Sequence, residues 1–273
     1  MMYFLKVFFL VFTFGMSIIF SAIKQLEASN EIYAPSGKSY CPTDRIDIGF
    51  VLLPDPLQVS SLLSYRDMVL ERLSGISPRK EESTRKPINV PVEMPHISLG
   101  HYALLAEELP MLREIINKVA FEFSALTEPM SEVLHATEYN LSFECKNLRE
   151  AVNPVIVDLY LNLRDKFFNE IVTKQPTIRG LHLKYVCKDK PTEFELLEKY
   201  YQNWNTPEYN RICPHFTLVY SHVGRENIIS TLSKIKTPPS LSEIRLTHLG
   251  LIAIDLNGNP LPDGLIHAVL LKQ

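Results

Sequence analysis

The sequence predicts an α+β fold made of two similar halves, with one ligand cleft between them. Three observations support this prediction. Strand-like and helix-like segments alternate from about residue 46 onward, a Pro-His-φ-Ser/Thr-Leu segment (φ apolar) occurs once in each half, and each copy precedes a helix and a pair of strands. Because the two copies are far apart in the chain, each of their histidines, His96 and His215, is expected to serve its own half of a pseudo-symmetric fold.

Composition predicts a folded chain without a long nucleic-acid partner. The chain has 273 residues, of which 46% are apolar and 22% charged, so it can bury a sizeable core. Its formal net charge is −3, from 28 basic and 31 acidic residues, and this lacks the positive excess that coating a long nucleic acid requires. Any RNA or nucleotide that the chain binds is therefore expected to be short, with no long duplex as partner. We also expect a monomer.

The N-terminal residues predict export. A start with one positive charge, Met1 to Lys6, precedes an uncharged apolar run from Val7 to Phe20 that continues to Ile23. This pattern is typical of a secretory signal, with cleavage after Ala28, and an exported protein would be periplasmic or secreted. An uncleaved membrane anchor is the alternative, because the run reaches the lower limit of spanning length, and contact with a membrane is expected only in that case. We expect a signal at 1–28, a linker or extended arm at 29–45 and one domain at 46–273.

The first half is predicted to begin with a short buried strand and an amphipathic helix. Apolar periodicity, prolines and glycines then give the order of the remaining elements. The expected elements are a strand at 48–53, a helix at 57–73 that Gly75 ends, a charged loop at 77–86, a strand within 91–102, a helix at 104–123, strands at 133–145 and 153–158, and a helix at 161–172. The second half repeats the order with a strand at 212–221, a helix at 226–235 and strands at 242–256 and 265–271, with Asn257-Gly258 as a turn.

Strand alternation predicts which side chains of the two motifs share a face. In the first copy His96, Ser98 and Gly100 fall on one face, while Ile97 and Leu99 fall on the other. In the second copy the two sets are His215, Thr217 and Val219 against Phe216, Leu218 and Tyr220. Each strand therefore combines one polar face with one apolar face that anchors it in the core.

The polar faces contain the groups that phosphoryl transfer needs. That reaction requires a base for the nucleophile, an acid for the leaving oxygen and donors for the phosphoryl oxygens. Because histidine titrates near neutral pH, one of His96 and His215 can be neutral while the other is protonated. The hydroxyls of Ser98 and Thr217 can hydrogen-bond the phosphoryl oxygens. The sequence leaves open which histidine is the acid and which is the base.

The two motif copies resemble the two-histidine phosphoesterase superfamily, which includes 2′-5′ RNA ligase-like and cyclic-nucleotide phosphodiesterase proteins. The resemblance spans about residues 46–272 and centres on Pro95-His96-Ile97-Ser98-Leu99 and Pro214-His215-Phe216-Thr217-Leu218. It implies a bilobal α+β fold in which each lobe is an antiparallel sheet with helices packed outside, and the His-x-Ser/Thr strands line a central groove. It also implies a phosphodiesterase without metal or other cofactor, acting on short RNA ends, 2′,3′-cyclic phosphates, 2′-5′ oligonucleotides or cyclic nucleotides. The alternative is a non-catalytic nucleotide-binding or interaction module on the same fold.

Other polar residues give weaker signals. His101 and His222 could ligate a metal in principle, but no paired carboxylate or His-x-x-x-His spacing supports them, so no metal site is predicted. Substrate contacts are assigned to Tyr102, Arg211 and Tyr220, with core packing as the competing interpretation of the tyrosines. The remaining histidines have structural interpretations: His135, His182, His248 and His267.

The four cysteines leave their chemistry open. They lack zinc-ligand spacing, so disulfides and buried thiols are the two interpretations that remain. The cysteines are Cys41, Cys145, Cys187 and Cys213.

Overall fold

The computed structural model describes residues 32–74, 89–132, 134–136, 140–144, 153–167, 215–221, 235–255 and 259–272. The predicted signal at 1–28, the charged loop at 77–86, the turn at 257–258 and nearly all of the helix predicted at 226–235 lie outside these ranges. Within them, no helix is long and apolar enough to cross a membrane.

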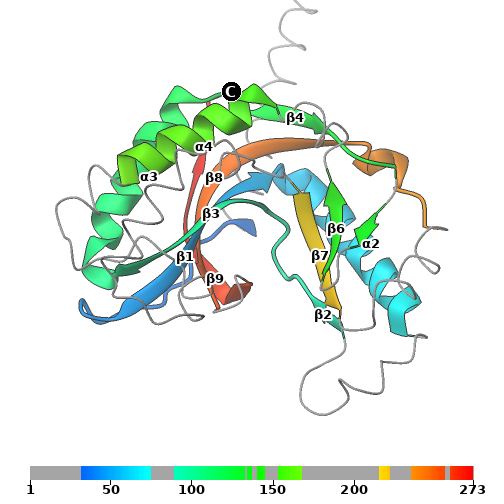
Figure 1. Ribbon diagram of the computed structural model, residues 1–273, viewed down its shortest axis with the longest axis horizontal. Coiled ribbons are helices and arrows are strands. Elements are labelled where there is room, and N and C mark those ends of the chain that lie inside the picture. The colour runs from blue at the N-terminus through cyan, green and yellow to red at the C-terminus, as the bar shows by residue number, and fades with distance from the viewer. Residues whose placement is uncertain are drawn as a thin grey trace, which may run out of the picture.

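Nine strands of the described residues form one antiparallel sheet. They are β1 (Arg45–Pro54), β2 (Asn89–Pro91), β3 (Ile97–Leu105), β4 (Leu126–Pro129), β5 (His135–Ala136), β6 (Asn140–Glu144), β7 (His215–Ser221), β8 (Glu243–Ile254) and β9 (Pro260–Leu270). Their order is β4-β8-β1-β3-β7-β6-β5, with β9 paired to β8 and β2 paired to β7. Figure 1 shows that the sheet curls into an arch along which β8 runs.

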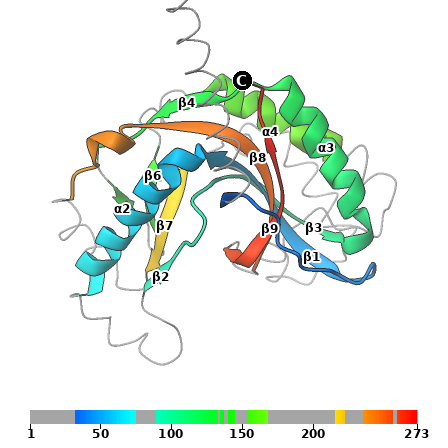
Figure 2. The ribbon, with the colours of Figure 1, turned by 180° about the vertical axis from the view of Figure 1, so that it is seen from behind.

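The described strands correct the expectation of a separate sheet in each lobe. β3 of the first half pairs with β7 of the second through Ile97 and Phe216, and this contact joins the halves into one sheet. The three helices are still divided between the two ends of the arch. Figures 1 and 2 show α3 (Leu109–Glu122) and α4 (Pro154–Phe167) together over one end, and α2 (Pro56–Ser74) along the other.

Helix boundaries follow local capping chemistry. Asp55 precedes α2 and accepts a hydrogen bond from the Leu57 amide at 3.0 Å, with Pro56 in the first helical position. Asn153 caps α4 in the same way, accepting from the Val155 amide at 3.0 Å ahead of Pro154. The strand predicted at 153–158 is therefore wrong, because these residues begin a helix.

Two further boundaries differ from the prediction. The helix predicted from residue 104 begins only at Leu109, because β3 continues to Leu105 and a 3-10 turn, η1 (Ala106–Glu108), follows it. Pro110 is then accommodated in the first turn of α3 instead of interrupting it. β4 was not predicted from the sequence.

The two faces of the sheet carry different cores. The larger core lies between the sheet and the three helices, and Phe50, Ile97, Ile116, Leu163 and Phe216 belong to it. A smaller apolar cluster lies on the opposite face. It consists of Tyr33, Val51, Leu53, Val59, Ile252, Ile254 and Leu265.

The described part of the predicted linker or arm packs against the domain. Tyr33 is buried, and its hydroxyl donates to the Pro54 carbonyl at 2.6 Å. The Ser36 amide donates to the Leu265 carbonyl at 2.7 Å. Residues of this segment thus cover the smaller cluster and contribute to the fold.

Candidate active site

The two motif strands meet side by side. Ile97 of β3 and Phe216 of β7 are antiparallel partners, and both side chains are fully buried in the larger core. Because side chains alternate along a strand, the residues that flank this pair point to the opposite face. The pairing therefore gathers Ser98, His215 and Thr217 on one face of the sheet, and a hydrogen bond between Ser98 and His96 brings His96 to the same face.

His96 lies in a loop that departs from the strand ladder. Pro91 of β2 pairs with Val219, and Ile97 of β3 pairs with Phe216, so the five residues 92–96 face only two residues of β7. The excess pushes the loop out of the sheet plane, as in an extended β-bulge. Hydrogen bonds of its two ring nitrogens therefore set the orientation of the His96 ring, since no regular ladder position does so.

Both ring nitrogens of His96 have hydrogen-bond partners. Nδ1 lies 2.8 Å from the Met94 carbonyl oxygen, and Nε2 lies 3.1 Å from Ser98 Oγ. A carbonyl oxygen only accepts, so Nδ1 carries a proton and donates it. In a neutral ring the lone pair is then on Nε2, which accepts from the Ser98 hydroxyl. Ser98 and His96 of the same motif are thus directly linked.

Burial keeps the His96 ring neutral at physiological pH. Its side chain is 5% exposed, and burial lowers its pKa from 6.5 to about 4. The hydrogen bond to the Met94 carbonyl opposes this shift, and the positive charge that His215 can carry adds to it. A neutral His96 ring can accept a proton through Nε2.

The second motif presents its groups differently. His215 is the first residue of β7 and is half-buried, whereas Thr217 is buried. A hydrogen bond links Thr217 with the Tyr220 side chain. Burial is the main cause that raises the pKa of Tyr220, and the nearby Asp255 carboxylate raises it further. Tyr220 therefore borders the site beside Thr217.

Each motif strand contains a register shift at the leucine of the motif, and the two shifts correct the predicted faces. Opposite β1, the register jumps from Ser98 to Gly100 across Leu99. Opposite β6, it jumps from Thr217 to Val219 across Leu218. One extra residue reverses the alternation beyond it. Gly100 and Val219 therefore leave the polar face, and Val219 belongs to the larger core.

The same register shifts bring two further residues onto the polar face. His101 pairs with Gly49 and lies toward Ile252 of the smaller cluster, and Tyr220 reaches Thr217. His101 and Tyr220 each stand three positions after the Ser or Thr of their motif, so they are pseudo-equivalent. This shared offset is the sequence feature that indicates their common position. Strict strand alternation places both residues on the opposite face and therefore hides it.

The other predicted substrate contacts have separate outcomes. Tyr102 is 1% exposed and packs between Phe50 and Phe167, with ring centroids 5.2 and 4.6 Å away. It is a core residue, so its assignment as a substrate contact is wrong. Arg211 and His222 lie outside the described residues, as do the cysteines other than Cys41, which is exposed.

No described residues assemble a metal site around His101. Among them, no three His, Cys, Asp or Glu side chains gather closely enough to hold an ion. His248 is buried on β8 between Tyr33, whose ring centroid is 4.9 Å away, and the Thr247 hydroxyl, 2.8 Å from Nδ1. His267 donates to Asn117 Oδ1 at 2.8 Å. These contacts agree with the structural interpretation of His248 and His267, and the side chain of His135 lies outside what the structure describes.

Several solved structures are similar to the chain over most of its length. Escherichia coli LigT in complex with 3′-AMP is 11% identical, with 84% of this chain and 100% of that chain covered and a TM-score of 0.46. A structure described as a phosphoesterase has 11% identity, the same coverages and a TM-score of 0.47. Kluyveromyces marxianus Usb1 has 13% identity, coverages of 84% and 98%, and a TM-score of 0.35. No family model and no curated protein sequence matches the chain. The chain is thus similar to solved structures that include one described as a phosphoesterase.

Proposed function

We propose that this protein is a metal-independent phosphodiesterase in which His96 and His215 act as general base and general acid. The observation that carries the proposal is the pairing of Ile97 with Phe216, because it gathers two histidines and two hydroxyls on one face of the sheet. The substrate class is a short RNA end, a 2′,3′-cyclic phosphate, a 2′-5′ oligonucleotide or a cyclic nucleotide. It needs no cofactor, because side chains supply every proton transfer.

The division of roles follows from the state of His96. Its neutral ring presents the Nε2 lone pair, so His96 is the base that takes a proton from the attacking water. As the new phosphorus–oxygen bond forms, the bond to the ribose oxygen breaks, and His215 in its protonated form gives its proton to that oxygen. Exchange with solvent then returns the proton to His215 and removes the one held by His96.

The two hydroxyls hold the phosphoryl group. In the unbound site the Ser98 hydroxyl donates to His96 Nε2, so it must rotate toward the phosphate when substrate arrives and frees the base. The Thr217 hydroxyl occupies the corresponding place in the second motif. Hydrogen bonds from both would stabilise charge that develops on the non-bridging oxygens. His101 and Tyr220, which stand farther along the same face, are the candidates for contact with the rest of the nucleotide.

The test is a substrate screen in chelator. Purified protein is assayed with 2′,3′-cyclic, 3′,5′-cyclic and 2′-5′-linked nucleotides in the presence of EDTA, and turnover of at least one class is expected. Loss of all turnover in EDTA that a divalent ion restores would contradict the metal-free mechanism. Nucleotide binding without hydrolysis of any class would favour the binding module.

We also propose that the protein is exported and that its N-terminal segment is removed. The uncharged run from Val7 to Phe20 and the small residue Ala28 support this proposal. Mass spectrometry of protein from the extracellular or periplasmic fraction should find a mature chain that begins near residue 29. A chain that retains Met1 in the membrane fraction would show an uncleaved anchor instead.

A further inference from the structure

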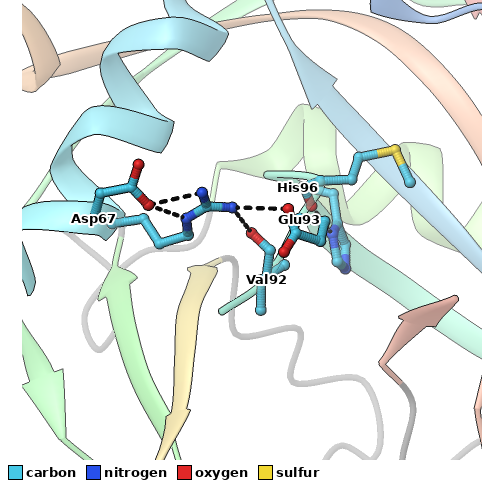
Figure 3. A network of polar contacts seen from close by, with 6 residues as sticks. Asp67, Val92, Glu93 and His96 are labelled. Carbon is cyan, nitrogen blue, oxygen red and sulfur yellow. Dashed lines mark hydrogen bonds and ion pairs between the residues drawn. The ribbon is translucent and has the colours of Figure 1, made fainter. Parts of the chain in front are cut away.

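Arg66 connects α2 to the loop that carries His96. Its side chain is 12% exposed, and its guanidinium is held on one side by Asp67, with Nε and Nη2 at 2.8 and 2.7 Å from Oδ1. On the other side Nη1 donates to the Val92 carbonyl at 2.9 Å and lies 3.3 Å from Glu93 Oε2. Figure 3 shows this network reaching the loop just before His96.

Val92 is held from two directions. Its carbonyl accepts from Arg66, and its amide donates to the Leu218 carbonyl of β7 at 2.9 Å. The loop is therefore fixed between α2 and the strand that carries His215 and Thr217. Two residues farther along, the Met94 carbonyl accepts the proton of His96 Nδ1 at 2.8 Å. A short covalent path thus joins the point that Arg66 holds to the group that orients the His96 ring.

We propose that Arg66 is a positioning residue for His96: by holding Val92 and Glu93 it keeps the Met94 carbonyl in place, and so keeps the His96 proton on Nδ1. The inference rests on the proposed function of His96 as a base. If the Met94 carbonyl moves away, the proton can sit on Nε2, and the nitrogen that faces the site loses its lone pair. Partners that fix the tautomer of a histidine contribute to its function even though they do not touch substrate.

The chemistry of the contact requires arginine. The planar guanidinium presents donors in two directions at once, so the two-point contact with Asp67 aims Nη1 at the loop. A lysine could reach the Val92 carbonyl with one donor but could not reproduce that fixed geometry. Glu93 contributes less than the Val92 carbonyl to the contact between Arg66 and the loop, because the Glu93 side chain is 71% exposed and water screens its charge.

The chain provides a matched control on another helix. Arg164 of α4 forms the same kind of pair with Asp165, at 2.9 Å from Nε and 2.8 Å from Nη2 to Oδ1, and its side chain is 13% exposed. Arg164→Met therefore removes a contact of equal geometry and burial. Its helix packs on β3 and α3, and the contact between Arg164 and Asp165 involves none of residues 92–96. Any general cost of losing such a pair appears in both variants, whereas loss of positioning appears only in Arg66→Met.

The test compares Arg66→Met, Arg66→Lys and Arg164→Met in the full protein. We expect kcat of Arg66→Met to fall about 10- to 100-fold with KM changed less than about twofold, Arg66→Lys to fall in between, and Arg164→Met to stay near wild type. Nitrogen-15 NMR of the histidines should show Nδ1–H in wild-type His96 and added Nε2–H in Arg66→Met. Should Arg66→Met not fold, Arg66→Lys carries the same two measurements.

Two results separate the positioning role from the proposed function. An unchanged kcat and an unchanged His96 tautomer in a folded Arg66 variant would overturn the positioning role. If wild-type protein turns over none of the substrates, the NMR comparison still decides: a shifted tautomer supports positioning and an unchanged one overturns it. The failure of catalysis and the failure of positioning therefore give different data.

Discussion

The two copies of the motif share a sequence pattern but differ in surroundings. His96 ends a five-residue loop, is 5% exposed, and has partners on both ring nitrogens. His215 is the first residue of β7, sits in register with Glu144 of β6, and remains half-buried. The two histidines have similar neighbours in sequence. The loop at 92–96 and its packing make His96 more buried than His215.

In the mechanism proposed above, this difference in surroundings lets a duplicated motif supply both a base and an acid. A base must be neutral and an acid must be protonated at the same pH. Burial lowers the pKa of His96, and a positive charge on His215 would lower it further. In the proposed mechanism, the loop before β3 therefore distinguishes His96, the proposed base, from His215, the proposed acid.

The strongest test of this comparison removes each histidine in turn. His96→Ala and His215→Ala should each lower kcat about 10²- to 10⁴-fold, or roughly 3 to 5 kcal/mol of transition-state stabilisation. The double variant should lose little more than the worse single one. A substrate whose leaving group needs no proton, such as a p-nitrophenyl ester, should restore much of the rate to His215→Ala but not to His96→Ala. The opposite pattern would reverse the assignment.

The stability of the protein in acid depends on both buried histidines, His96 and His248, whereas activity is expected to depend on His96 alone. His96 and His248 both have a pKa lowered from 6.5 to about 4, chiefly by burial. The unfolded chain binds more protons than the folded one between these values, so stability falls as pH drops from 6.5 toward 4, by up to roughly 3 kcal/mol for each histidine. Urea unfolding at pH 7 and pH 5 should show a smaller loss in His248→Gln than in wild type. Activity of that variant at pH 7 should stay near wild type, unlike that of His96 variants.

The hydroxyls should contribute less than the histidines. Ser98→Ala and Thr217→Ala each remove one donor to a charged phosphoryl group, about 1.5 to 3 kcal/mol, which corresponds to roughly 10- to 150-fold in kcat/KM. Ser98→Ala also frees His96 Nε2 in the unbound site, so its loss should be the smaller of the two. Steady-state kinetics of both variants at one pH decides this. A larger loss in Ser98→Ala would show that Ser98 assists His96 during the reaction.

The mildest effect concerns the acid side of the pH profile. kcat/KM reports the free enzyme, in which the pKa of His96 is about 4. The base should therefore stay deprotonated, and kcat/KM should not fall between pH 7 and pH 5.5. Circular dichroism at each pH confirms that the protein is folded. A decline centred near pH 6.5 would show an ordinary histidine base and would remove the distinction between the two motifs.

Much of the fold and of the site could be predicted from periodicity and spacing. The strand at 48–53 and the helix at 57–73 correspond to β1 and α2, and the second motif strand corresponds to β7 within the described residues. Residues 153–158 were misassigned, because β-branched apolar residues there suit a strand, while Asn153 and Pro154 cap and start a helix. Capping chemistry outweighed residue propensity.

What the sequence alone determined is the pair of motifs and their alternation, since side chains of an extended strand point to opposite faces whatever surrounds it. For that reason Ile97 and Phe216 lie in the core. The histidine and the hydroxyl residue of each motif lie on the other face. Tertiary structure decided the register shifts at Leu99 and Leu218, the loop at 92–96 and the burial of His96. A register shift is defined by how the residues of one strand pair with those of its neighbour. The pKa of a buried histidine depends on how far neighbouring elements exclude water from it. Both are therefore properties of contacts between segments that are distant in sequence.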